Sequence, residues 1–390
     1  MKKYVLALLS TLPLLLLSTI SFAEQSTPKA SIPSAQRILF GQTAAIGGPA
    51  SALGVGMRDG ILAAFKEQND KGGVKGFTLD LLTLDDGYEP EQAVINTKKL
   101  INNKDVFALI GGVGTPTANA IEPITSQAKV PFIAPFTGAQ FLREPYKRYV
   151  VNTRASYWQE TEEWVAYAVD KLGYSKFSIL YQDDTYGRAG LSGVERALKK
   201  RGLTLLSEGT YKRNTTAVKM ALFNIMNTDP EMVFMVGAYK PCAAFIKLAK
   251  QRKINAKFIN ISFVGTKAII EELENQGEGV IISQVVPFPF DDTNPLIQTY
   301  KKALESHGCT DKIGFVSLEG YIAGRLVIDV LKNMDLKNLT REGFLDALID
   351  IKNFDINGLN LTFGKGDNQG SNSVFLTRID GQGKIQPLKS

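Results

Sequence analysis

VFALIGGVGTPTANA, residues 106–120, is the stretch that decides the fold. The apolar run over residues 106–110 predicts a buried strand, and residues 119–128 have the pattern of a helix. Glycines between a strand and a helix usually mark a close approach of the backbone to a neighbour or a ligand. The stretch therefore predicts a strand–turn–helix unit of an α/β fold, with free backbone N–H groups at its turn.

The same alternation continues along the chain in both directions. Apolar runs bounded by Gly and Pro, separated by helical patterns of ten or more residues, indicate βαβ units and parallel sheets. The expected strands cover residues 37–43, 78–85, 106–110, 130–134, 177–181, 204–209, 232–236, 257–261 and 280–284. The expected helices cover residues 51–70, 90–102, 119–128, 157–172, 188–201, 216–227, 241–252, 294–307 and 315–334, before strand-like segments at 358–363 and 374–380.

The N-terminus has the features of an export signal. Lys2 and Lys3 precede an apolar run, and small residues lead to a cleavage point after Ala23. We therefore expect residues 1–23 to be a Sec-type signal peptide and residues 24–36 a flexible leader; a membrane anchor is the alternative. Residues 1–23 hold two lysines and no acid, so cleavage lowers the net charge from +6 to +4. That excess predicts no nucleic-acid surface, and the remaining length of about 350 residues favours two domains.

Residues that would support an enzyme are sparse. His307 is the only histidine, and the chain lacks the G-x-S-x-G and H-E-x-x-H motifs. Pairs of acids at residues 85–86 and 183–184 follow expected strands, where ordinary strand-end or helix N-terminal roles explain them about as well as catalysis. His307 and Cys309 make half of a metal site at best, so no metal or other cofactor is expected. Cys242 and Cys309 could form a disulfide or remain free thiols.

The turn at residues 111–117 does not fit a nucleotide. The last glycine of G-x-G-x-x-G is missing, and no G-x-x-x-x-G-K-[ST] sequence occurs. Free N–H groups at the helix start, with the hydroxyl of Thr115 or Thr117, suit a single carboxylate. Helix capping by Thr115, with Pro116 at the first helical position, is the structural alternative, and both can hold together.

Several segments together resemble the type I periplasmic binding proteins of the Leu/Ile/Val-binding family, the extracytoplasmic solute receptors of ABC importers. The similarity covers essentially all of the mature chain. Its segments are residues 41–94 and the sequences ALIGGVGTPT (108–117), VPFIAPFTGAQFLR (130–143), SILYQDDTYGRAG (178–190), VFMVGAYKPCAAFIKLAKQ (233–251) and LNLTFGKGDNQG (359–370).

The resemblance implies two Rossmann-like α/β lobes with central parallel sheets, joined by a three-crossover hinge and closing on a solute. The crossovers would lie near residues 152–156, 284–287 and 363–371. Residues 37–154 with 287–364 would form lobe 1, and residues 155–286 with 365–390 would form lobe 2.

The resemblance also implies a set of ligand-binding residues. Backbone and hydroxyl donors near Gly114 and Thr115 would hold the solute's carboxylate, and the tyrosines would come from the second lobe. Partial burial of Tyr186 and Tyr239 as packing residues is the alternative. The implied binding residues are Leu53, Gly114, Thr115, Phe136, Thr137, Tyr186, Tyr239 and Ser262.

Ser262 marks a departure from the family pattern. Amino-acid-binding members usually place an acid in this turn to receive the ammonium group, and burying an ammonium without an anionic partner costs several kcal/mol. Either Asp183 or Asp184 takes that role, or the solute lacks an α-ammonium. Phe136 and Phe263 make the expected site more apolar, so an amide or a hydrophobic carboxylate is an alternative to an amino acid.

The expected function is that of a periplasmic solute-binding protein of an ABC importer. The partners would be a small-molecule solute and an inner-membrane permease, with no nucleic acid, and the family favours a monomer. A ligand-sensing partner of a membrane kinase or chemoreceptor is the first alternative. A secreted enzyme using the paired aspartates is the second.

Overall fold

A computed structural model describes residues 36–102 and 106–388. The predicted signal peptide and nearly all of the predicted leader lie outside these residues. The first strand already begins at Gln36, one residue before its expected start.

The first sheet is parallel throughout, with strand order β2-β1-β3-β4-β5. Strand β1, which lies between β2 and β3, is buried along nearly its whole length, as expected for a strand covered on both faces. The bounds are β1 Gln36–Ala44, β2 Phe77–Asp85, β3 Val106–Ile110, β4 Phe132–Ile133 and β5 Val150–Val151. We refer to this sheet and its covering helices as the first lobe.

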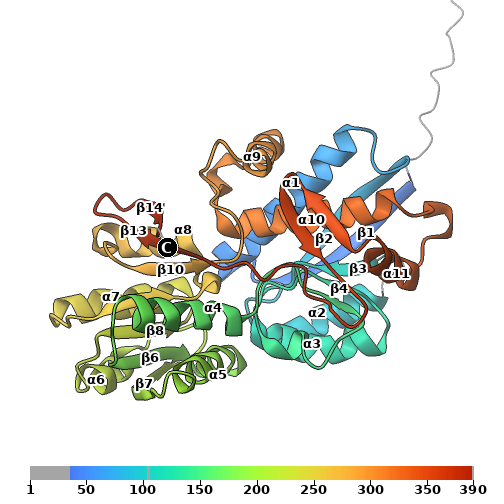
Figure 1. The fold of residues 1–390 in the computed structure, drawn as a ribbon. Coiled ribbons are helices and arrows are strands. Elements are labelled where there is room, and N and C mark those ends of the chain that lie inside the picture. The colour runs from blue at the N-terminus through green and yellow to red at the C-terminus, as the bar shows by residue number, and fades with distance from the viewer. Residues whose placement is uncertain (1–35, 103–105, 389–390) are drawn as a thin grey trace, which may run out of the picture. The chain divides into compact units, whose positions relative to one another are not determined.

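Helices from both ends of the chain cover the first sheet. The blue α1 and the orange α10 lie against each other in Figure 1. Glycines make this approach possible: a Cβ at Gly60 would lie 2.0 Å from the Ser317 carbonyl oxygen, and one at Gly320 would lie 2.3 Å from that of Met57. The helices are α1 Ser51–Asp70, α2 Pro90–Asn102, α3 Thr115–Gln127, α9 Pro295–His307, α10 Phe315–Lys332 and α11 Arg341–Ile351, with a hairpin of β11 Asn353–Ile356 and β12 Leu359–Thr362.

The second sheet has the order β14-β13-β10-β9-β8-β6-β7. Strands β6 to β10 run parallel, and β13 and β14, formed by the last residues of the chain, add antiparallel strands at one edge. The strands are β6 Phe177–Gln182, β7 Leu205–Tyr211, β8 Met232–Val236, β9 Lys257–Asn260, β10 Ile281–Gln284, β13 Phe375–Ile379 and β14 Ile385–Pro387. The helices of this second lobe are α4 Tyr157–Val165, α5 Thr185–Lys199, α6 Lys219–Met226, α7 Tyr239–Gln251 and α8 Thr266–Leu273.

The chain passes between the two sheets three times, after β5, after β10 and after β12. The first and third crossovers are hydrogen-bonded to each other. Asn152 N–H donates to the Asn368 carbonyl at 2.8 Å, and Gly370 N–H donates to the Asn152 carbonyl at 2.7 Å. This isolated parallel bridge couples the two crossovers, which suits a hinge. The predicted fold class, two α/β lobes joined by three crossovers, is confirmed.

Most of the predicted elements are present, with three informative differences. The expected helix over residues 157–172 is α-helical only to Val165 and then becomes a π-helix, Ala166–Lys171. The helices α8 and α11 were not predicted. Eight residues are too few for a clear helical period in α8, and its start depends on Gly265, whose φ is +79°.

The two cysteines are free thiols, Cys242 buried and Cys309 half-buried. Among the described residues, no helix combines the length and the apolar character needed to cross a membrane.

Candidate functional site

The turn that precedes α3 forms one wall of the candidate site. Gly114 has φ +108°, and a Cβ there would lie 2.2 Å from the ring of Tyr88, so glycine is required. The Thr115 hydroxyl does not cap α3. It lies 2.6 Å from the Thr137 hydroxyl, and both side chains are fully buried. The interpretation of Thr115 as a helix cap is therefore wrong: tertiary packing supplies this hydroxyl with a partner on another loop.

An aromatic cluster lies between the two lobes. Tyr88 and Phe136 follow strands of the first sheet, whereas Tyr157, Tyr186 and Phe263 begin or precede helices of the second lobe. Phe263 is at the centre, with ring centroids 4.6 Å from Tyr186, 5.3 Å from Phe136 and 5.9 Å from Tyr88. Tyr157 packs on Tyr186 at 5.8 Å. All five side chains are buried, so the lobes meet here through side chains that belong to both.

Tyr157 brings a third hydroxyl to the pair formed by Thr115 and Thr137. Burial raises the pKa of Tyr157, although Arg154 and the two threonine hydroxyls oppose the shift. The Tyr157 hydroxyl is buried, yet it makes no hydrogen bond of normal geometry to any described residue. A buried hydroxyl of this kind is costly unless a ligand or water satisfies it. We call Thr115, Thr137 and Tyr157 the hydroxyl corner.

Ser262 belongs to a buried ionic network. Its N–H and its hydroxyl each donate to a carboxylate oxygen of Glu160 at 2.9 Å, and its hydroxyl accepts from Arg154. Arg154 also forms an ion pair with Glu160 at 3.1 Å. It forms a second ion pair, at 3.4 Å, with Glu319, which lies on α10 of the first lobe. The anionic partner that the sequence lacks at Ser262 is thus present on α4, already paired with an arginine.

The charges in this region are nearly balanced. Burial, aided by Glu160, raises the pKa of Glu319 to about 7 even though Arg154 opposes the shift. Burial, aided by Arg154, lowers the pKa of Arg143 to about 9. The Arg154 guanidinium also lies 5.1 Å from the ring centroid of Phe136, in cation–π geometry. Two arginines therefore face two glutamates, which leaves no surplus negative charge for a ligand's ammonium.

Arg143 connects the elements around the hydroxyl corner. It donates to the carbonyls of Ala139 at 2.9 Å and Arg154 at 3.1 Å, and to the side-chain oxygen of Gln369 at 2.5 Å. It thereby ties the loop after β4 to the first and third crossovers. Arg143 is a positioning residue that the sequence pattern did not single out.

Two cavities lie near the aromatic cluster: Tyr88 itself lines one, and the other is lined by Gly265, two residues after Phe263. One, of about 180 Å³, is lined by Leu53 of α1 and Gly265 beside α8, among others. The other, of about 340 Å³, is lined by Tyr88 and by Gln182 and Tyr211 of the second lobe. Each is bounded by residues of both lobes. The candidate site is therefore the region between the two lobes that holds the aromatic cluster and borders these cavities.

The predicted site residues separate into a centre and a rim. Thr115, Thr137, Phe136 and Tyr186 come together at the aromatic cluster, with Gly114 directly behind Tyr88. Leu53, Tyr239 and Ser262 lie around it: Leu53 contacts the backbone at Gly265, and the Tyr239 hydroxyl accepts the Ala52 N–H of the first lobe at 3.4 Å.

Tyr88, Arg154, Tyr157, Glu160 and Glu319 were missed as site residues. One signal could have revealed Glu160. It lies on the same face of α4 as the buried Tyr157, Thr161 and Trp164, and an acid among buried positions requires a partner.

The aspartates considered for catalysis have structural partners. Asp85 accepts the N–H groups of Ile46, Gly47 and Gly87, and Asp86 accepts from the Thr43 hydroxyl and Tyr88 N–H. Asp184 caps α5 through Tyr186 N–H and pairs with Arg213, and Asp183 pairs with Arg188 at the surface. Each of the four carboxylates therefore has structural partners, and none needs a catalytic role to explain its position.

Comparison with known proteins places the chain in a family. The protein-family model described as "Periplasmic binding protein" matches residues 38–384 of this chain. The Leu/Ile/Val-binding protein homolog 7 of Brucella abortus is 22% identical over 325 residues, covering 77% of this chain and 78% of the relative.

Solved structures agree. The structure of a possible leucine/isoleucine/valine-binding protein from Rhodopirellula baltica has a TM-score of 0.88 and 36% identity, covering 92% of this chain and 98% of that one. A substrate-binding periplasmic protein from Ralstonia solanacearum has a TM-score of 0.84 and 26% identity, covering 90% and 100%. The chain belongs to the periplasmic binding protein family.

Proposed function

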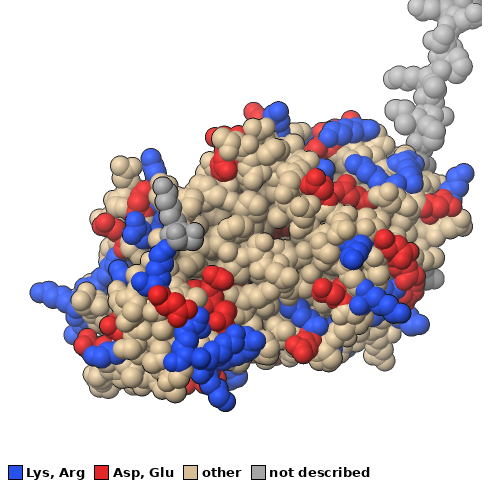
Figure 2. Space-filling view, viewed as in Figure 1, with Lys and Arg blue, Asp and Glu red and all other residues tan. Residues whose placement is uncertain are grey.

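We propose that this protein is an exported, monomeric solute receptor of an ABC importer, without enzymatic activity and without a cofactor in solute binding. It would bind its solute between two lobes and deliver it to an inner-membrane permease. Residues 37–154 and 287–364 would form the first lobe, and residues 155–286 and 365–390 would form the second. Family membership supports the binding role, and the names of the relatives support amino-acid-like solutes and a periplasmic location. Basic and acidic side chains are interspersed over the face seen in Figure 2, which suits a small solute better than a nucleic acid.

We further propose that the solute has a carboxylate or amide at one end, an apolar body, and no α-ammonium. The observation that carries this proposal is the buried Tyr157 hydroxyl, which lies beside those of Thr115 and Thr137 but makes no hydrogen bond of normal geometry to a described residue. A carboxylate or amide oxygen would accept hydrogen bonds there. The rings of Phe136, Tyr186 and Phe263 would then face the apolar body.

The absence of an ammonium follows from the charges. Glu160 and Glu319 are both paired with Arg154. Asp183 and Asp184 are engaged by Arg188 and Arg213. Each of these four acids already has an arginine partner, so a ligand ammonium beside them would have to share that partner, and its desolvation would cost several kcal/mol.

A matched set of ligands tests the solute class. Leucine, 4-methylpentanoate and 4-methylpentanamide share one apolar body, and phenylalanine with 3-phenylpropanoate forms a second set. In thermal-shift and calorimetric titrations, we expect saturable binding of the carboxylates or the amide and much weaker binding of the amino acids. A ligand at a hundred times its Kd stabilises the folded protein by about 2.7 kcal/mol. Tight binding of leucine without binding of 4-methylpentanoate would contradict the proposal.

Capture of membrane partners tests the importer role. We expect the liganded protein to retain an ABC permease from detergent-solubilised membranes of the producing cell. Recovery of a membrane kinase or chemoreceptor without a permease would favour the sensory alternative. Incubated solutes should be returned unchanged, and chemical turnover would contradict the binding-protein assignment.

A further inference from the structure

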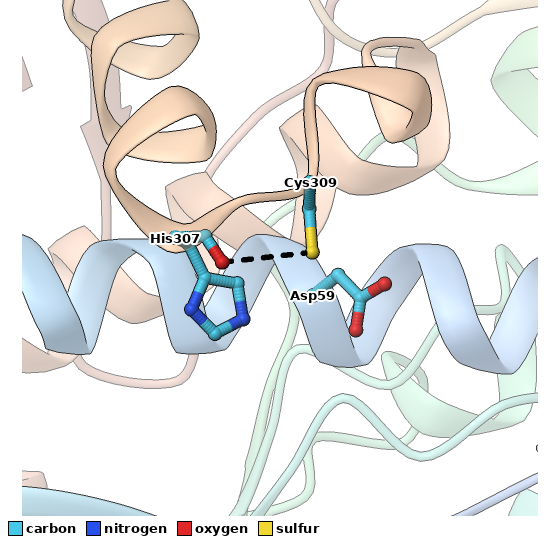
Figure 3. A group of neighbouring side chains, drawn as sticks. All are labelled: Asp59, His307 and Cys309. Atoms are coloured by element: carbon cyan, nitrogen blue, oxygen red, sulfur yellow. Dashed lines mark hydrogen bonds between the residues drawn. The ribbon is translucent and has the colours of Figure 1, made fainter.

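Three potential metal ligands meet where α9 ends against α1. Asp59 comes from α1, His307 is the last residue of α9, and Cys309 follows the left-handed Gly308. Figure 3 shows the three side chains grouped in the space between the two segments. One ligand atom from each lies within 4.8 Å of the other two. The sequence pattern suggested only half of a site here, because Asp59 is about 250 residues away along the chain.

We propose that Asp59, His307 and Cys309 form a binding site for a divalent, borderline-soft cation of the zinc class. A carboxylate oxygen, an imidazole nitrogen and a thiolate sulfur are the three ligand types that Zn²⁺ uses in proteins. Three protein ligands leave a fourth position for water. Hard cations such as Mg²⁺ or Ca²⁺ prefer sets made only of oxygen atoms.

The geometry needs only a small closure. Metal–ligand distances of about 2.0–2.3 Å place the ligand atoms of one zinc ion about 3.5 Å apart. The ligand atoms here must therefore approach by about 1 Å. Asp59 cannot supply the movement, because α1 is clamped against α10 through Gly60. His307 and Cys309 flank the turn at Gly308, and Cys309 is a half-buried free thiol, so the turn can close on the ion.

The surrounding charges are compatible with a cation. Asp59 is only 3% exposed. The Nε and Nη2 atoms of Arg58 both lie 2.8 Å from the same carboxylate oxygen of Asp59, Oδ1, so the other oxygen, Oδ2, is left for a metal. The C-terminal end of α9 carries the negative end of the helix dipole. Asp311 lies nearby and is paired with Lys312. Lys312 and Arg58 are the opposing charges, and the bond from Arg58 to Oδ1 also orients the carboxylate.

Metal binding at this position would hold a segment of the first lobe that contacts the second lobe. Lys267 of α8 donates to the backbone carbonyl of Asp311, and residues 311, 312 and 314–317 line the cavity next to Leu53. An ion on His307 and Cys309 would fix the start of this segment to α1. The site lies apart from the hydroxyl corner and does not depend on the identity of the solute.

Titration of the chelator-treated protein with Zn²⁺ alone tests the proposal. Calorimetry should show saturable 1:1 binding, and Co²⁺ should give the absorption of a thiolate-ligated tetrahedral ion. Asp59→Asn, His307→Gln and Cys309→Ser should each weaken Zn²⁺ binding by tenfold or more, since even loss of a residue behind the ligands costs 10–100-fold. Asp311→Asn removes a nearby charge without removing a ligand, and it should change the affinity by less than threefold.

Two results would overturn the site. One is the lack of 1:1 Zn²⁺ binding by the parent protein. The other is a Cys309→Ser variant that keeps both the Zn²⁺ affinity and the Co²⁺ spectrum. Cys309 is half-buried in a turn, so this variant should keep its fold, and thermal denaturation in chelator checks that it does. Because the probe is zinc, failure here leaves the solute-binding proposal untouched.

Discussion

At the scale of single residues, the hydroxyl of Thr115 has a role that its position in the sequence left open. It begins α3, where a threonine commonly caps a helix, yet it pairs with Thr137 at 2.6 Å from another loop. The backbone N–H groups of the turn therefore depend on other acceptors, and the hydroxyl is committed to the corner that Tyr157 completes.

Replacing Thr115 by Val tests the corner. The change keeps the shape of the side chain and removes one hydrogen-bonding group from the proposed carboxylate or amide contact. We expect solute affinity to fall about tenfold, or ~1.4 kcal/mol, measured by calorimetry. Thr125→Val is the matched control: Thr125 is equally buried in α3, but its hydroxyl bonds to the Glu122 carbonyl of its own helix. Equal losses of affinity in both variants would argue against a specific role for Thr115.

At the scale of elements, the first crossover and α10 meet through Arg154 and Glu319. A buried carboxyl whose pKa is raised from 4.5 to about 7 is more protonated in the folded state than in the unfolded chain. Its contribution to stability is complete below about pH 4.5 and is lost as the pH rises to about 7. The free energy of unfolding therefore declines towards neutral pH, because the cost of burying the ionised Glu319 exceeds what its ion pair with Arg154 returns.

Glu319→Gln should remove this pH dependence. For the parent protein, the shift corresponds to a loss of roughly 3 kcal/mol in the free energy of unfolding across that window. The variant should show a smaller decline, with a remainder from Asp86, whose pKa burial raises to about 6. Urea unfolding at pH 4.5, 6 and 7.5 measures the effect. Parallel declines in parent and variant would show that Glu319 is not the titrating group.

The close packing of α1 on α10 gives a second prediction at this scale. In Gly320→Ala the new methyl group would lie 2.3 Å from the Met57 carbonyl oxygen, and neither helix backbone can easily move. We expect a loss of about 1–3 kcal/mol from overpacking, partly offset by the better helix propensity of alanine. Gly381→Ala, whose methyl group would be no closer than 3.4 Å to a neighbour, should be nearly neutral in the same denaturation assay. A stable Gly320→Ala protein would mean that the two helices can separate at little cost.

At the scale of the whole molecule, closure of the lobes joins groups that are far apart in the chain. Beside the aromatic cluster, Arg213 of the second lobe pairs with Glu89 of the first at 2.8 Å, and Asn214 donates to the Gly87 carbonyl at 3.0 Å. Both charged side chains are partly exposed, so this pair contributes at most about 1 kcal/mol and is weakened by salt.

Glu89→Gln should therefore increase the rate of solute release a few-fold and make that rate less sensitive to salt. Stopped-flow displacement of a bound solute at low and moderate ionic strength measures both effects. Asp183→Asn is the control, because Asp183 and Arg188 form an exposed pair within the second lobe. If the control releases solute as fast as Glu89→Gln, the interlobe pair has no special part in closure.

Local patterns were sufficient to predict the architecture of this protein. Residues 106–120 predicted a strand, a turn and a helix because apolar runs and glycine punctuation act over a few residues. Their repetition predicted parallel sheets, and the resemblance supplied the hinge and most of the candidate binding residues. Such features depend on neighbours in the chain, which a single sequence displays.

The tertiary structure alone decided the partners. Glu160 accepts a hydrogen bond from Ser262, and Arg154 of the first crossover pairs with Glu319 of α10. Asp59 lies beside His307 and Cys309, which are far away along the chain. Burial then determines what these groups can do, since a carboxyl or a thiol removed from water needs a partner that only folding can bring to it. The sequence by itself determined the alternating strands and helices of the α/β lobes, and the resemblance supplied the expected positions of the crossovers. The charge balance of the cleft and the grouping of the three metal-ligand side chains follow from contacts between residues that no short-range pattern connects.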